Sequence, residues 1–249
     1  MLKFIFIILN IVIILLFILI GGVIPLVERK YLSLIQRRVG PKFVGYNGRL
    51  QFLADALKIL LKEIIYLINI NKILLITIPI ILLNLNISLL IYLIWFNNIY
   101  LYNTSYFIFL LLVIEIITNF FLTIIGIFVK NKYTTIASTR LINGSIIFDI
   151  FIMSCFLILY IIHQSTSLEI LNQKWFFDLK FINIVTLVPI FTYLVLINLK
   201  KVPFDLIEAE TELIMGYSIE HSGFLAGSLL LIEYLHLFFW SVFMTILFF

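Results

Sequence analysis

Acidic side chains are crowded into one short stretch of an otherwise apolar sequence. Five of the thirteen acidic residues lie within sixteen positions, and they are Asp205, Glu208, Glu210, Glu212 and Glu220. In a helix Glu208 and Glu212 share a face and Glu210 points nearly opposite, whereas in an extended loop all three point the same way. Crowded carboxylates hold protons more readily than isolated ones. The stretch is therefore a candidate for proton exchange, and a solvated loop held by Lys200 and Lys201 is the alternative.

Three other carboxylates stand within long apolar stretches, at Glu115, Asp149 and Glu233. A carboxylate at the centre of a membrane helix costs about 2.5–3.5 kcal/mol on translocon scales, so each of these must face protein or water. An acid in this position is a functional candidate by default. A neutral, hydrogen-bonded structural acid is the alternative reading.

A third group of charges lies between Glu28 and Lys72, a stretch too long for a simple connection. From Arg49 the spacing of polar residues against leucines predicts an amphipathic helix in the membrane interface. One interpretation makes the basic residues topology anchors that reach toward lipid phosphates. The other places a polar opening at the membrane surface, lined by Glu28, Arg29, Arg38, Asp55, Lys58 and Lys62.

Composition restricts the elements that can position these charges. The chain has 249 residues, of which 63% are hydrophobic and 12% charged, and its mean hydropathy is +1.21. A soluble domain carries about twice that share of charge, so a soluble domain, a disordered tail and a disulfide scaffold are excluded. Cys155 is the only cysteine, and His163, His221 and His236 form no metal motif. We expect no metal, no redox cofactor and no catalytic group on this chain, and no nucleic-acid partner.

The expected fold is an all-α integral membrane protein, because a spanning helix needs about 20 mostly apolar residues. Six stretches qualify, at about 4–27, 73–96, 106–129, 141–162, 181–199 and 223–249. They leave inner loops at 28–72, 130–140 and 200–222, and we expect 1–249 to form one multi-span domain.

Basic residues predict the orientation of these spans. Fourteen of the seventeen Lys and Arg residues fall in the three inner loops, and only Lys3, Lys174 and Lys180 lie on the other side. By the positive-inside rule, the N-terminus lies outside and these loops face the cytoplasm or matrix.

Two stretches carry a resemblance to a known family. The run LVERKYLSLIQRRVGPKFVGYNGRLQFLADALKILLKE (Leu26–Glu63) closely resembles subunit 1 of respiratory complex I, the proton-translocating NADH:quinone oxidoreductase. The run KKVPFDLIEAETELIMG (200–216) resembles a second signature of the same family. The resemblance implies that the first loop helps to form the quinone chamber together with two peripheral subunits. Glu28 and Arg29 match a chamber-lining pair, and Asp55 and Lys58 match polar positions beside the chamber.

The resemblance also implies a chain of carboxylates that leads from the second loop into the membrane. Each of the five loop acids falls on a family acid. Asp149 lies where the family carries Glu after Arg140, and Glu233 with Tyr234 matches a membrane Glu-Tyr pair. Asp149, Glu233 and Arg140 are therefore the expected relay residues, whereas Glu115 has no counterpart that we can place.

Two departures from the family stand out. Asn198 replaces an acid near the end of the fifth span, so a relay there needs water, Asn198 as a non-titrating bridge, or another acid. The family usually has eight spans, and six are expected here. We therefore expect an N-terminal part of the subunit, with the missing spans supplied by a separate companion chain, and a genuinely shortened subunit is the alternative.

The resemblance implies ubiquinone as the substrate of the complex, with FMN and Fe-S clusters in partner subunits. The implied partners are peripheral quinone-site subunits, antiporter-like and small membrane subunits, and phospholipid. The implied location is the mitochondrial inner membrane, with a bacterial plasma membrane as the alternative. Two other functions stay open: a stand-alone proton- or cation-coupled transporter, and the homologous membrane subunit of an energy-converting hydrogenase.

Overall fold

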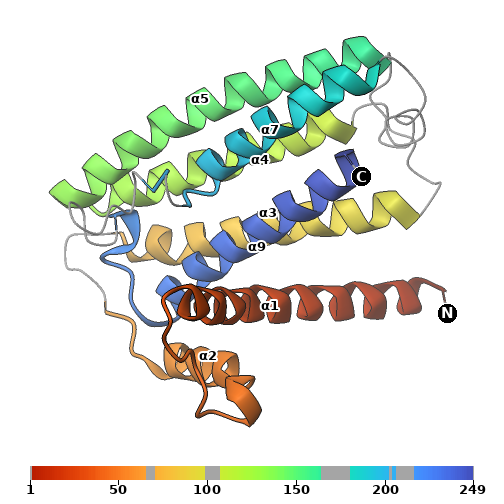
Figure 1. Cartoon of the computed structure of the whole chain (residues 1–249). Helices are drawn as coiled ribbons and strands as arrows, with labels where there is room; N and C mark the ends of the chain where they lie inside the picture. The colour runs from red at the N-terminus through yellow and green to blue at the C-terminus, as the bar shows by residue number, and fades with distance from the viewer. Residues whose placement is uncertain are drawn as a thin grey trace. The chain divides into compact units, whose positions relative to one another are not determined.

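The computed structural model describes residues 2–65, 71–98, 107–163, 180–201, 204–205 and 216–248. Its α-helices are α1 (Leu2–Ile35), α2 (Gln51–Leu61), α3 (Lys72–Asn98), α4 (Phe107–Phe128), α5 (Lys132–His163), α7 (Lys180–Asn198) and α9 (Gly223–Phe248), with 3-10 turns η1 (Tyr46–Gly48) and η2 (Gly216–Ser218) (Figure 1). Five of them, α1, α3, α4, α5 and α9, are long and apolar enough to cross a membrane. The apolar part of α7 within the described residues, Thr186–Asn198, is shorter. The expected all-α membrane fold is confirmed.

The chain divides into two compact units. Unit 1 comprises Met1–Ile91 and His221–Phe238, and unit 2 comprises Tyr92–Glu220 and Phe239–Phe249. Helices α3 and α9 therefore contribute residues to both units.

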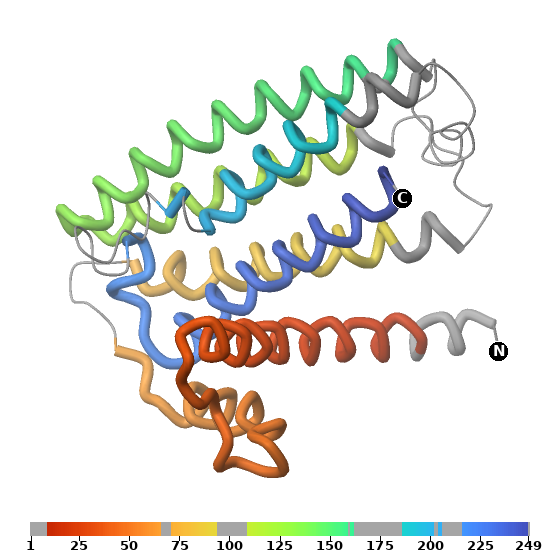
Figure 2. The backbone as a smooth tube through the Cα atoms, in the orientation of Figure 1, coloured from red at the N-terminus to blue at the C-terminus, as the bar shows by residue number. Residues whose placement is uncertain are grey.

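In unit 1, α2 packs against the C-terminal part of α1 (Figure 2). Phe52 of α2 lies against Gly22 of α1, and Ile59 lies against Gly227 of α9. A Cβ atom on Gly227 would lie 2.5 Å from Cγ2 of Ile59, so the glycine gives α2 room to approach there, whereas a Cβ atom on Gly22 would be in ordinary contact with Phe52 at 3.6 Å. The leucines at 53, 57, 60 and 61 are exposed on the other side of α2, as expected for a helix whose apolar face meets lipid.

In unit 2, α4, α5 and α7 lie side by side (Figure 1). The core of this unit contains a cluster of rings from α5, α7 and the end of α9, in which Phe156, Phe191, Trp240 and Phe243 meet in tilted or edge-to-face pairs. Such ring pairs contribute about 0.5–1.5 kcal/mol each beyond the area that they bury. The ring cluster therefore stabilises the packing of the helices that carry the polar residues of this unit.

Helix α5 begins earlier than the sequence predicted. Residues 130–140 were expected as an inner loop, but the helix already begins at Lys132. The hydroxyls of Thr135, Ser138 and Thr139 donate to backbone carbonyls three residues earlier. Because these bonds satisfy the polar side chains locally, a segment that reads as a loop by polarity is compatible with a helix.

Basic residues in the left-handed conformation end three of the helices. Arg37, Lys130 and Lys200 have φ values of 54°, 56° and 53° and follow α1, α4 and α7. Glycine is the usual residue at such a position, because the left-handed region strains other side chains. A cation at a helix C-terminus interacts favourably with the helix dipole, which offsets part of that strain.

Candidate functional site

Two charged residues of unit 1, Arg29 and Asp55, meet where α1 and α2 pack together. Arg29 Nη1 lies 2.8 Å from Asp55 Oδ2, and Gln51 Nε2 donates to the other carboxylate oxygen, Oδ1, at 3.1 Å. The side chains of Arg29 and Asp55 are 55% and 36% exposed, so water reaches the pair. An ion pair as accessible as this contributes only about 0–1 kcal/mol to stability. Its charges stay available to a ligand or partner.

Helix α9 adds two polar residues to this region of unit 1. The Tyr234 hydroxyl donates a hydrogen bond to the Glu28 carboxylate, and its neighbour Glu233 acts on it electrostatically. Of the sequence-predicted residues, the structure thus brings Glu28, Arg29 and Asp55 together, with Glu233 next to Tyr234. We call Glu28, Arg29, Gln51, Asp55 and Tyr234 the surface cluster.

Other predicted residues of the first inner loop stand apart from this cluster. Arg38, Lys58 and Lys62 are exposed, and within the described residues their side chains make no ion pair. The loop itself is tied back to α1 by a hydrogen bond from Lys30 Nζ to the carbonyl of Asn47. The three cations are therefore placed for solvent, lipid phosphate or a partner rather than for the surface cluster.

A second polar site lies inside unit 2. Asn198 Nδ2 of α7 donates to Glu115 Oε1 of α4 at 2.7 Å. Glu115 is 2% exposed and Asn198 8%, so this is a buried pair. A hydrogen bond to a charged group contributes about 1.5–3 kcal/mol, and burial makes its loss costly. Asn198, the residue at which the resemblance implies an acid, is thus hydrogen-bonded to an acid of another helix.

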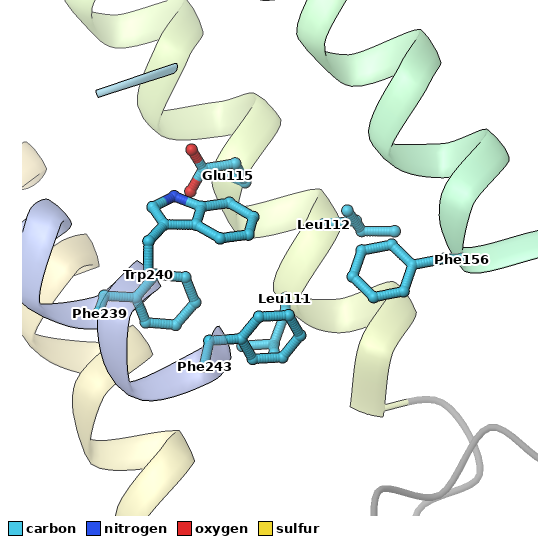
Figure 3. Close-up of a pocket in the computed structure, with 7 residues that line it drawn as sticks. All are labelled: Leu111, Leu112, Glu115, Phe156, Phe239, Trp240 and Phe243. Atoms are coloured by element: carbon cyan, nitrogen blue, oxygen red, sulfur yellow. The ribbon is translucent and has the colours of Figure 1, made fainter. Parts of the chain in front are cut away.

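Glu115 also lines a small cavity in unit 2 (Figure 3). The other lining residues are apolar or aromatic, and they are Leu111, Leu112, Phe156, Phe239, Trp240 and Phe243. The space is sufficient for about one water molecule. Figure 3 shows the Glu115 carboxyl group beside the Trp240 ring, in a lining that is otherwise made of rings and two leucines.

A stripe of buried polar residues continues from Glu115 along α4. Thr118, Asn119 and Thr123 are all buried. The hydroxyls of Thr118 and Thr123 donate to backbone carbonyls, whereas Asn119 Nδ2 has no hydrogen-bond partner among the described residues. A buried amide donor of this kind normally bonds to water. On α5, Asp149 interacts electrostatically with Glu115.

The acids of the second inner loop are only partly within the described residues. Glu220 accepts a hydrogen bond of 2.7 Å from Asn131 Nδ2 in the turn between α4 and α5. Asp205 and Arg140 are half-buried, and both interact with other residues. Glu208, Glu210 and Glu212 lie outside the described residues.

Sequence reasoning left Glu115 unassigned and did not select Gln51 or Asn131. The cost of burying a carboxylate had marked Glu115 as unusual, but its partner is 83 residues away and no local pattern indicates the pair. Gln51 carried a usable signal, because it precedes Asp55 by one helical turn.

Long apolar helices with a buried acid–amide pair, together with exposed charges near a helix end, define a class of protein. It is the class of multi-pass membrane proteins, in which an ionisable group inside a helix is a functional candidate. The comparisons with known proteins make this specific. A model of the NADH dehydrogenase family matches residues 7–249, and the chain belongs to that family.

Relatives from several organisms agree with this assignment. The chain is 35% identical to NADH-ubiquinone oxidoreductase chain 1 of Paramecium tetraurelia, over 96% of this chain and 92% of the relative. It is 30% identical to the protein of the same name in Apis mellifera ligustica, over 98% and 79%. It is 28% identical to an NADH-quinone oxidoreductase subunit of Ruthia magnifica, over 89% and 63%.

Proposed function

We propose that this chain is a membrane subunit of a proton-translocating NADH:ubiquinone oxidoreductase and forms the membrane side of its quinone-binding chamber. The observation that carries the proposal is the surface cluster, which lies largely within the Leu26–Glu63 stretch of family resemblance and in a chain matched by the family over residues 7–249. The membrane would be the mitochondrial inner membrane or a bacterial plasma membrane, with the N-terminus on the outer side.

The reaction at such a chamber consumes two electrons and two protons for each ubiquinone that becomes ubiquinol. The electrons would come from NADH through FMN and Fe-S clusters held by partner subunits. This chain would bind the quinone head, with Arg29 and Gln51 as donors and Asp55 orienting both. Exposed Arg38, Lys58 and Lys62 would meet lipid phosphate or a peripheral subunit.

Charge changes at the chamber would act on carboxylates nearby. Two unit charges about 4 Å apart interact by several kcal/mol at an effective dielectric near 20. We propose that Asp205, Glu208, Glu210, Glu212 and Glu220 respond first, followed by Glu115, Asp149 and Glu233, with Arg140 as a nearby cation. The Glu115–Asn198 hydrogen bond supports the inclusion of Glu115, because Asn198 is the residue at which the expected chain of acids is interrupted.

The test uses the intact complex with Asp55→Asn. The substitution keeps the shape of the side chain but removes the charge that orients Arg29. We expect the KM for a short-chain ubiquinone to rise about tenfold, since a charge-assisted bond is worth about 1.5 kcal/mol or more. NADH oxidation by ferricyanide, which needs no quinone, should stay unchanged. An unchanged quinone KM would contradict the chamber assignment.

Native electrophoresis separates this function from a stand-alone transporter. The proposal requires the chain to migrate in a very large complex together with NADH-oxidising activity. Migration of the chain alone, or as a small homo-oligomer, would reject it in favour of the transporter.

A further inference from the structure

One hydrogen bond connects the end of the acidic stretch to the helices that carry the buried acids. Asn131 Nδ2, in the turn between α4 and α5, donates to Glu220 Oε1 at 2.7 Å. The two residues are 89 positions apart, and both are half-buried. The bond therefore fixes a long-range contact within unit 2.

The backbone around Glu220 is held in place by other contacts. Tyr217 of η2 is fully buried and packs on α4, where a Cβ atom added to Gly126 would lie 3.5 Å from its Cβ atom. Lys200 Nζ, at the end of α7, lies 5.0 Å from the centre of the Tyr217 ring. We call residues 216–220 the docked turn. Because Tyr217 anchors it, the docked turn does not depend on the Asn131–Glu220 bond for its place.

Asn131 has a second role as the N-cap of α5. Its Oδ1 accepts the backbone N–H of Tyr133 at 3.4 Å, and its carbonyl accepts the N–H of Thr135 at 3.0 Å. With Oδ1 turned to the helix, the amide nitrogen on the same side chain is directed away from it and reaches Glu220. Asp and Ser are N-caps about as good as Asn, so the two roles of Asn131 are separable by substitution.

We propose that Asn131 is a positioning residue for Glu220, whose carboxylate it holds against the inner ends of α4 and α5. The inference rests on the proposed function, in which Glu220 belongs to the quinone chamber. Through this bond, a charge change at Glu220 acts on the turn that joins the helix of Glu115 to the helix of Asp149. Within the part of the chain that the structure describes, Asn131 is the side chain that donates to Glu220.

The decisive experiment compares Asn131→Asp, Glu220→Gln and the double variant in the intact complex. Asn131→Asp keeps the helix cap but sets a carboxylate against the Glu220 carboxylate. We expect the KM for a short-chain ubiquinone to rise about fivefold to tenfold, with ferricyanide reduction unchanged. The double variant re-forms an acid–amide pair with donor and acceptor exchanged, and its KM should fall to within about twofold of wild type.

Asn71→Asp is the matched control. Asn71 caps α3 in the same way, with Oδ1 accepting the N–H of Ile73 at 3.2 Å and its carbonyl accepting the N–H of Leu75 at 3.2 Å. Among the described residues no carboxylate accepts its amide. The quinone KM of Asn71→Asp should stay at the wild-type value.

The outcomes separate this inference from the proposed function. If Glu220→Gln changes the quinone KM while Asn131→Asp behaves like Asn71→Asp, the positioning role is wrong and the chamber assignment stands. If the quinone KM of the double variant is as high as that of Asn131→Asp, the positioning role is also wrong. If Asp55→Asn leaves the KM unchanged, the proposed function fails, whatever the result for Asn131→Asp. Should Asn131→Asp fail to assemble, Asn131→Ser keeps the cap but is too short to reach Glu220, and the same rise in KM is expected.

Discussion

The surface cluster of unit 1 and the buried pair of unit 2 both contain a hydrogen-bonded carboxylate, but they differ in how much water reaches that carboxylate. In the first, Arg29 and Asp55 are about half-exposed and share their charges with water. In the second, Glu115 and Asn198 are buried, and the Asn198 amide takes the place of water at one oxygen of the carboxylate. The accessible pair can be lost with little effect on stability, whereas the buried pair cannot. We infer that the first is suited to ligand exchange and the second to holding a charge or proton in one place.

The largest effect is expected from Asn198→Leu. The substitution leaves the buried Glu115 without its amide donor, at a cost of about 3–5 kcal/mol if the carboxylate stays charged and about 1–3 kcal/mol if it becomes neutral. The measurement is the temperature at which half of the purified complex loses activity. Asn84→Leu, at an exposed position of α3, is the control with the same change of side chain.

A second variant sharpens this result. Replacing both partners, as in Asn198→Leu with Glu115→Leu, removes the buried charge together with its donor and should restore much of the lost stability. If Asn198→Leu destabilises the protein no more than Asn84→Leu does, the buried pair is not required for the structure.

An intermediate effect is expected where two helices within one unit approach each other through glycine. In unit 2, a Cβ atom on Gly126 of α4 would lie 2.8 Å from Ser138 Cβ and 3.0 Å from the Thr134 carbonyl oxygen of α5. Because a backbone atom cannot turn aside, Gly126→Ala should cost about 1–3 kcal/mol. At Gly227 in unit 1 the close atom is Cγ2 of Ile59, a side chain that can rotate, so Gly227→Ala should cost less.

Gly144→Ala provides the baseline for this series, since a Cβ atom there meets nothing within 4 Å. It should be neutral or stabilise α5 by up to about 1 kcal/mol, because Ala favours the helix over Gly. Thermal inactivation of the three variants in one preparation gives the ranking. Equal stabilities of Gly126→Ala and Gly144→Ala would contradict the close packing of α4 on α5.

Much of the fold could be predicted because the constraint of the bilayer is strong. Apolar length alone indicated α1, α3, α4, α5 and α9 as membrane helices. Helix ends were harder. The structure begins α5 at Lys132 rather than near residue 141, and it ends α1, α4 and α7 at basic residues in a conformation for which glycine is the usual signal. The positions of these helix ends depend on local hydrogen bonds, which cannot be predicted from the polarity of the sequence.

The candidate sites also differ in how far they could be predicted from the sequence. Arg29 and Asp55 were selected from a local stretch, and the structure pairs them. The partner of Glu115 could not be read from sequence, because Asn198 reaches it through the packing of α7 against its neighbours. A relay at Asn198 was expected to need water, Asn198 as a bridge, or another acid, and the structure shows that Asn198 is hydrogen-bonded to Glu115. The Asn131–Glu220 bond is long-range in the same sense.

The smallest stability effect, and the sharpest test of the comparison, is expected from Arg29→Ala. Loss of an ion pair as exposed as this should change the free energy of unfolding by less than about 1 kcal/mol. Under the proposed function the same substitution removes a donor to the quinone head, so the KM for a short-chain ubiquinone should rise about tenfold. Arg49→Ala is the control, since its guanidinium stacks on Tyr46 in the same loop and is not part of the surface cluster. A large loss of thermal stability with an unchanged quinone KM would mean that Arg29 and Asp55 support the fold, and the contrast between an exchangeable surface cluster and a fixed buried pair would have to be given up.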